Sequence, residues 1–403
     1  MAASPKVDGD SVPFVSSVST AERDYHSDVV GSRALGHVLV LAIASGGCAF
    51  LVGIEERSEA VATANDAAIL PDAEVDSGAP PDDGRCGVGE VRCNGECVNL
   101  ETSSTNCGSC GHDCLGAPCS RAECEPEQLT AAAYGQIAVV DDTEVFYRAS
   151  PDEVAVAPLI ARNKKTGVER TVTQIGRWHS TLIDGPDIVI LENGPVPRLR
   201  FVHRTTGAEK ILHSDATAAP FVDLALAGDD IYWTTRGDVR HIKRDGTGFQ
   251  ILKVVPKGAL KIAIGATEVF YSVADEANVY AIPRAGGEAV VRATGTGTVN
   301  SITVVADKIF FSSGTNMNVF ENGTSTSQFL KLNIVHSTAL ADNVIYLYDV
   351  RFGQAQGSRI VRYDTTTRTE KEIVTFVRDG RLAIDATHVY FSNYIGALFR
   401  VAR

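Results

Sequence analysis

The stretch that decides the fold is Asp230-Ile231-Tyr232-Trp233-Thr234, continued by Gly237-Asp238-Val239 and then by Arg244-Asp245-Gly246-Thr247-Gly248. A short aromatic strand is followed by a tight turn, a second strand that ends on a base, and a glycine-rich turn. Six further runs match the run at 231–233: Val145-Phe146-Tyr147, Ile188-Val189-Ile190, Val269-Phe270-Tyr271, Ile309-Phe310-Phe311, Val344-Ile345-Tyr346 and Val389-Tyr390-Phe391. These seven runs begin 43, 43, 38, 40, 35 and 45 residues apart, so the chain repeats.

Each aromatic run is preceded by a short apolar run and followed by two more candidate strands. The preceding runs are 137–140, 181–183, 223–227, 261–264, 301–305, 338–340 and 381–384. A period of about 40 residues with four short strands is typical of propeller blades, which bury their apolar faces by stacking around a ring. We therefore predict an all-β fold, a seven-bladed β-propeller of four-stranded blades, over residues 125–403.

The last repeat has three strands, since the sequence stops at Arg403 directly after the third one, at 398–402. A spare extended segment, 119–132, lies just before the first repeat. An unpaired sheet edge is unfavourable, so we expect this segment to add the missing outer strand and to close the ring.

The Tyr232-Trp233-Thr234 run and the turn at 244–248 resemble the repeat of YWTD-type propellers, which are extracellular protein-binding rings. Only this repeat carries the three residues in order, and YWTD rings have six blades where we count seven repeats. The resemblance is therefore to the blade type, and it extends to the propellers of many exported bacterial lipoproteins. It implies binding and transfers no catalytic residue.

Eight of the nine cysteines fall in a small segment, which we treat as a disulfide-rich module at 86–124. They are Cys86, Cys93, Cys97, Cys107, Cys110, Cys114, Cys119 and Cys124. A dense, even set predicts disulfides and an oxidising compartment, and the spacing does not choose the pairing. A zinc site that uses His112 with some of these cysteines is the alternative. The run 106–111 also resembles the cysteine-rich modules of myxobacterial surface proteins.

The ninth cysteine, Cys48, follows a candidate export signal. Residues 38–44 are apolar, Arg33 precedes them, and Ser45-Gly46-Gly47 leads to Cys48. This resembles a bacterial lipobox, with Ser45 where Leu is usual, and it implies that Cys48 is lipidated. A plain cleaved signal or a buried cysteine is the alternative. We assign 1–47 to the export signal region and expect translation to start at Val29 or Val30.

Residues 48–85 are expected to be a disordered acidic linker between the lipid anchor and the module. Between 55 and 85 there are nine acids and two bases, with no aromatic residue. From Leu129 onward 30 bases meet 29 acids. The propeller is therefore near neutral, and we expect no nucleic-acid partner.

Two histidines lead into innermost strands, in Trp178-His179-Ser180 and in Val335-His336-Ser337. Innermost strands open onto the central channel, and long connections at 148–158, 192–198 and 348–357 are expected on the same face. We predict that a ligand contacts this face through Trp178, His179, His336, Arg351 and Phe352. A channel histidine that binds a metal or acts as acid or base is the alternative.

The sequence carries no catalytic, phosphate-binding or metal-binding motif, so we predict no catalytic residue, metal or cofactor. The recurring acids at Asp142, Asp187, Asp230, Asp307 and Asp342 are interpreted as hairpin-turn residues. We predict a monomeric, membrane-anchored binding protein at the bacterial outer membrane or cell surface that recognises a protein, peptide or glycan. A propeller lyase or hydrolase and a structural component of the cell envelope are the alternatives.

Overall fold

A computed structural model describes residues 86–130, 135–150, 156–350, 358–377, 381–392 and 397–403. All of these lie in the second of two compact units, Pro80–Arg403. The export signal, Cys48 and the linker lie outside the described residues. The described part of the chain contains no helix that is long and apolar enough to cross a bilayer.

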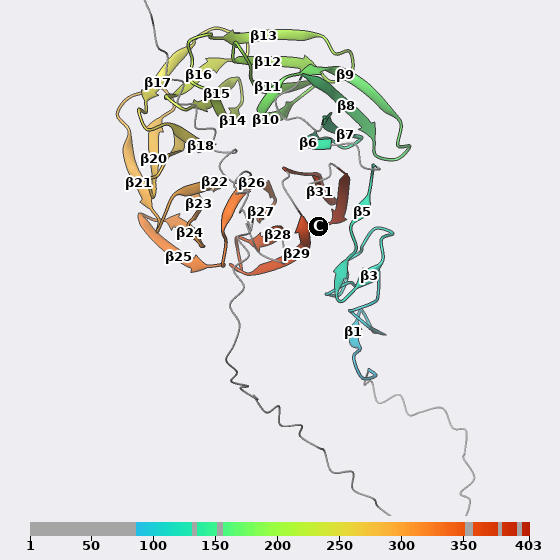
Figure 1. Cartoon of the computed structure of the whole chain (residues 1–403). Helices are drawn as coiled ribbons and strands as arrows, with labels where there is room; N and C mark the ends of the chain where they lie inside the picture. The colour runs from blue at the N-terminus through green and yellow to red at the C-terminus, as the bar shows by residue number, and fades with distance from the viewer. Residues whose placement is uncertain (1–85, 131–134, 151–155, 351–357, 378–380, 393–396) are drawn as a thin grey trace, which may run out of the picture. The chain divides into compact units, whose positions relative to one another are not determined.

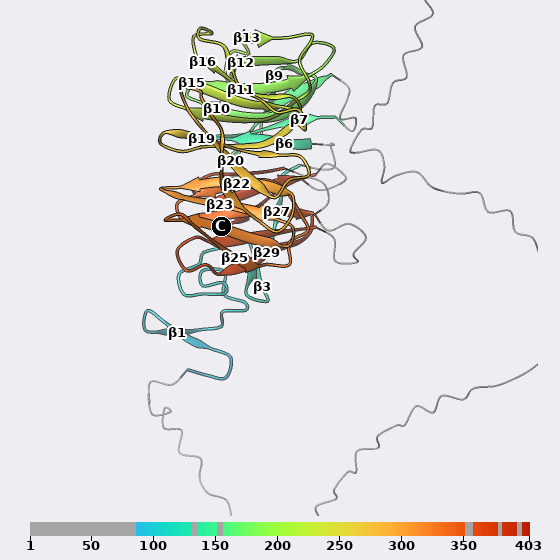
Figure 2. The ribbon, with the colours of Figure 1, turned by 90° about the vertical axis from the view of Figure 1, so that its left-hand side faces the viewer.

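Seven four-stranded antiparallel sheets form a seven-bladed β-propeller, as the repeat predicts (Figure 1). In Figure 2 the outer strands of blades two and five lie on opposite sides of the ring. From the centre outward, the blades are β6(Gly135–Val140), β7(Glu144–Ala149), β8(Ala157–Asn163) and β9(Glu169–Ile175); β10(Arg177–Asp184), β11(Asp187–Asn193), β12(Arg198–His203) and β13(Glu209–Ser214); β14(Phe221–Ala227), β15(Asp230–Thr235), β16(Asp238–Lys243) and β17(Gln250–Val254); β18(Ala259–Ile264), β19(Glu268–Val273), β20(Asn278–Pro283) and β21(Val290–Thr294); β22(Val299–Val305), β23(Lys308–Ser313), β24(Asn316–Glu321) and β25(Thr324–Phe329); β26(Ile334–Ala341), β27(Val344–Val350), β28(Ser358–Asp364) and β29(Glu370–Val377); β30(Leu382–Ile384), β31(His388–Ser392), β32(Leu398–Ala402) and β5(Glu127–Gln128).

The aromatic runs are the second strands of the blades, and they are buried along almost their whole length. In β15, Tyr232 and Trp233 are at most 1% exposed, and the equivalent residues of the other blades are buried in the same way. A second strand has a neighbour on each edge, and its two faces pack against the adjacent blades. Both faces must therefore be apolar, which explains why these runs do not alternate with polar residues.

The ring closes through the N-terminal segment, as expected. The strand β5 pairs with β32, so that Gln128 lies opposite Phe399 and Glu127 opposite Arg400. Beyond this pairing, the amide of Leu129 donates to the carbonyl of Leu398 at 2.7 Å. The outer strand of blade seven therefore comes from a segment that precedes blade one in the chain.

A repeated ion pair joins neighbouring blades on the face opposite the starts of the innermost strands. In five blades the residue directly after the third strand is a base that reaches an acid of the preceding blade. The pairs are Lys164–Asp385, Arg204–Asp141, Arg244–Asp184, Arg284–Asp230 and Arg403–Asp342. The hairpin acids noted in the sequence thus include inter-blade partners, and Lys164 with Asp385 joins blade one to blade seven.

The cysteine-rich segment contains four disulfides, which pair Cys86–Cys97, Cys93–Cys110, Cys107–Cys119 and Cys114–Cys124. Its two short hairpins are β1(Val91–Cys93) with β2(Glu96–Val98) and β3(Cys119–Ser120) with β4(Glu123–Cys124). The segment also contacts the propeller, because Lys371 of β29 donates to the carbonyl of Ala122 at 3.3 Å. Such a disulfide set requires an oxidising compartment, so the protein is extracytoplasmic.

Candidate functional site

The innermost strands share a β-bulge near their first residues. In β10 the register shifts between Trp178 and Ser180, and in β26 it shifts between Val335 and Ser337. His179 and His336 are therefore the extra residues of equivalent bulges. The side chains of Trp178, His179 and His336 lie outside the described residues, and the bulge places only their backbones at the same height in blades two and six.

The residue that follows the bulge is polar in every blade from two to seven, and these residues form what we call the collar. Its members are Ser180, Asp223, Lys261, Ser301, Ser337 and Arg381. Ser180, Asp223, Ser301 and Ser337 occupy the same register position against the second strand of their own blades. The innermost strands surround the channel (Figure 1), so the collar lies at one end of it.

The collar side chains bridge adjacent blades. Asp223 accepts a hydrogen bond from the amide of Ile262 in blade four at 3.2 Å. Ser337 accepts the equivalent bond from the amide of Leu382 in blade seven at 3.3 Å. The hydroxyl of Ser180 lies 3.5 Å from a carboxylate oxygen of Asp223. The same position therefore holds the blades together while it presents polar groups to the channel.

Asp223 is the acid of the collar, and two cations act on it. Burial raises the pKa of its carboxyl, while Lys261, the amides of Ile262 and Leu224, and Arg381 act to lower it. Lys261 belongs to the adjacent blade four. Arg381 belongs to blade seven, across the channel from blade three. Its influence on Asp223 shows that the channel is narrow at the collar, so a group that enters there meets all three charges.

A cavity of about 350 Å³ lies directly beyond the collar, lined by the innermost strands of blades two to six. At one register position its wall consists of Leu182, Ala225, Ala263, Thr303 and Ala339. Small residues there leave space in the channel, and most of the wall is apolar. The site therefore combines a charged collar with an apolar chamber, a combination typical of small-molecule sites.

The longest connections between second and third strands lie on the collar face, because antiparallel strands bring those connections to the edge where innermost strands begin. They are 150–156 in blade one and 351–357 in blade six. Arg351 and Phe352 belong to the latter and lie outside the described residues. The prediction for blade two was wrong: its connection, 194–197, equals that of blade four, 274–277, because β11 and β12 run further than their apolar cores suggest.

Sequence reasoning missed the charged members of the collar. Asp223, Lys261 and Arg381 each begin a run that was assigned to an innermost strand. The signal was present in the repeat alignment, since each stands one residue before an apolar position that recurs. Without the bulge, however, the register of that residue is undefined, because a shift of one residue reverses the face of a strand.

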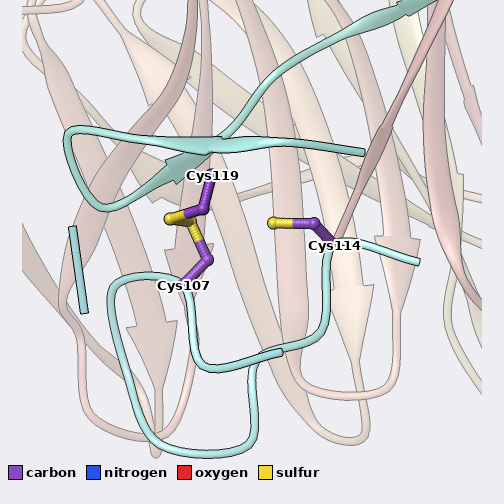
Figure 3. A group of neighbouring side chains, drawn as sticks. All are labelled: Cys107, Cys114 and Cys119. Carbon is purple, nitrogen blue, oxygen red and sulfur yellow. A yellow bond between two sulfur atoms is a disulfide. The ribbon is translucent and has the colours of Figure 1, made fainter. Parts of the chain in front are cut away.

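The one cluster that could suggest a metal in the described part of the chain is formed by Cys107, Cys114 and Cys119, whose sulfur atoms lie within 4.8 Å of one another. Figure 3 shows Cys107 bonded to Cys119, and Cys114 is bonded to Cys124. Metal ligation requires thiolates. All eight cysteines of the module are in disulfides, so the alternative of a zinc site with His112 is wrong.

No protein-family model and no curated protein matches the chain. Among solved structures, the extracellular domain of a one-component system from B. thetaiotaomicron matches 68% of this chain and 41% of that one, at 11% identity and a TM-score of 0.52. The C-terminal WD40 domain of Sif2 matches 69% and 98%, at 13% identity and 0.49. A nidogen/laminin complex matches 60% and 91%, at 12% identity and 0.44. These identities concern the fold alone.

Proposed function

We propose that the protein is a membrane-anchored extracytoplasmic binding protein whose collar face recognises a protein, peptide or glycan. The observation that carries this proposal is the collar of charged and hydroxyl groups over an apolar chamber. It lies on the face that carries the longest connections. A rigid ring that presents long connections and a charged opening on one face is suited to binding.

The membrane anchor is the first part of the proposal that can be tested. If Cys48 carries the lipid, Cys48→Ser is expected to move the protein from the membrane fraction to the soluble fraction of its host. The matched control is the pair Cys86→Ser and Cys97→Ser, which removes one exported disulfide and should leave the protein in the membrane fraction. Unchanged fractionation of Cys48→Ser would contradict the anchor.

Binding on the collar face is tested by capture of a partner from the host's own surface extract. Trp178→Ala, Phe352→Ala and Lys261→Ala should each weaken the captured complex, by roughly 2 kcal/mol where the side chain is a hot spot. Lys253→Ala, an exposed lysine on the outer strand β17, is the matched control and should bind normally. Loss of binding in Lys253→Ala alone would place the site on the ring's outer edge. Failure of the unaltered protein to capture anything would favour a structural role in the envelope.

An enzymatic role is the second candidate, and the equivalent bulges favour it. They place the backbones of His179 and His336 three blades apart around the channel, next to the collar that contains Asp223. Histidine beside a carboxyl group is a common acid–base arrangement. For a lyase or hydrolase, His179→Ala should retain the captured partner and abolish its cleavage. A partner that remains intact with the unaltered protein would exclude this role.

A further inference from the structure

We propose that the collar binds a carboxylate group and that the apolar chamber receives the apolar substituent of the same molecule. This inference rests on the proposed function and names the chemistry of its ligand. The ligand is either a free amphipathic acid or the C-terminal carboxylate of a peptide that ends in an apolar residue.

The charges of the collar favour a single negative charge on the ligand. The collar contains two cations, Lys261 and Arg381, and one carboxylate, that of Asp223. Both oxygens of this carboxylate already accept hydrogen bonds from backbone amides, those of Leu224 at 3.0 Å and Ile262 at 3.2 Å. Asp223 thus offsets one of the two positive charges, and a monoanion offsets the other.

A buried hydroxyl group provides an independent observation. Ser392, the last residue of β31, is 1% exposed, and its hydroxyl has no hydrogen-bond partner among the described residues. It lies one position beyond the pair Leu382 and Phe391, which places it opposite Arg381. In blades four and five the equivalent hydroxyls, on Ser272 and Ser312, bind collar residues at 3.1 and 2.8 Å. A buried hydroxyl without a partner is unfavourable, and a ligand carboxylate would supply the acceptor.

The chamber determines what the carboxylate is attached to. Three successive residues of each lining strand, for example Leu224, Ala225 and Leu226, form its wall. At about 3.3 Å per residue the chamber is roughly 10 Å deep. Its first wall residues directly follow the collar, as Leu224 follows Asp223. A carboxylate at the collar would therefore direct an unbranched apolar chain or an apolar side chain into the chamber.

The test is calorimetric titration of the purified full-length chain at neutral pH. Octanoate is the probe for a free acid, and acetyl-Ala-Ala-Leu is the probe for a peptide terminus. Octanol, octylamine and acetyl-Ala-Ala-Leu amide are the controls that lack the carboxylate. At least one acid is expected to bind at least tenfold more tightly than its controls, and the tighter of the two identifies the source of the carboxylate.

Variants separate the head from the tail of the ligand. Arg381→Met should weaken the acid at least tenfold, Arg381→Lys should retain part of the affinity, and Ala225→Leu, which fills the chamber, should abolish binding. Arg368→Met, at an exposed ion pair on another part of the ring, is the control and should change nothing. A circular dichroism melt of each variant reports whether it folds. Equal binding of octylamine and octanoate, or no effect of Arg381→Met in a folded protein, would overturn the proposal.

This result is distinguishable from failure of the proposed function. If no acid binds but Lys261→Ala still abolishes capture of the partner, the collar binds something other than a carboxylate and the proposed function stands. If octanoate binds but the collar variants capture the partner normally, the ligand chemistry stands and the proposed binding face is wrong.

Discussion

A chain that begins at Gly135 is expected to unfold at a temperature roughly 10 °C lower than a chain that begins at Glu125. The shorter chain lacks β5 and the hydrogen bonds of Leu129 and Thr130 to Leu398, at 2.7 and 3.1 Å. Blade seven then exposes the edge of β32 and the apolar side chains beneath it. Lost hydrogen bonds and exposed apolar surface together amount to an order of 5 kcal/mol.

The comparison is matched because both chains lack the disulfide module and differ only in the closing segment. Differential scanning calorimetry gives both transition temperatures. If the two chains melt together, the ring is closed by the other contacts between blades one and seven, of which Lys164 with Asp385 is the most buried ion pair. The role assigned to β5 would then be wrong.

Arg359→Met is expected to be the most damaging single substitution in the ring. The guanidinium group of Arg359 lies 3.0 Å from the Asp349 carboxylate, which is fully buried. It also donates to the carbonyl of Leu330, in the connection from blade five, at 2.9 Å. Removal of one partner leaves a buried charge uncompensated, which costs roughly 3–5 kcal/mol of unfolding free energy.

Chemical denaturation measures this loss, and two further variants explain it. Arg368→Met breaks the exposed pair with Glu321 and should change the unfolding free energy by less than about 1 kcal/mol. Combining Arg359→Met with Asp349→Asn removes the stranded charge and should recover part of the loss. If the double variant is as unstable as the sum of the two single variants, the two side chains are not coupled and this explanation fails.

The fold could be predicted from the sequence because one signal, the period of the aromatic runs, is repeated seven times. Ring closure followed from the same count, since the last repeat stops after its third strand and a spare segment precedes the first. The base after each third strand was visible as well. Its partner was not, because the acid belongs to the preceding blade, about 20 to 60 residues earlier in most pairs or across the ring closure for Lys164.

The site was predicted less well than the fold. The sequence indicated the correct end of the channel from the residues before the innermost strands, but it favoured His179 and His336 and passed over Asp223, Lys261 and Arg381. These three residues are far apart in the chain and look like ordinary strand ends. They become a site only when the ring closes and the bulges set their register. Burial, which raises the pKa of the Asp223 carboxyl, likewise depends on the assembled ring.

The central claim, that the ligand binds at the collar end of the channel, is tested most directly by hydrogen–deuterium exchange on the full chain with and without its captured partner. The prediction is slower exchange at the first residues of β14, β18 and β26 and in the connection 194–197, with no change in the outer strands β13, β17 and β21. Protection confined to the outer strands, or to the turns on the opposite face such as 245–248, would contradict the account.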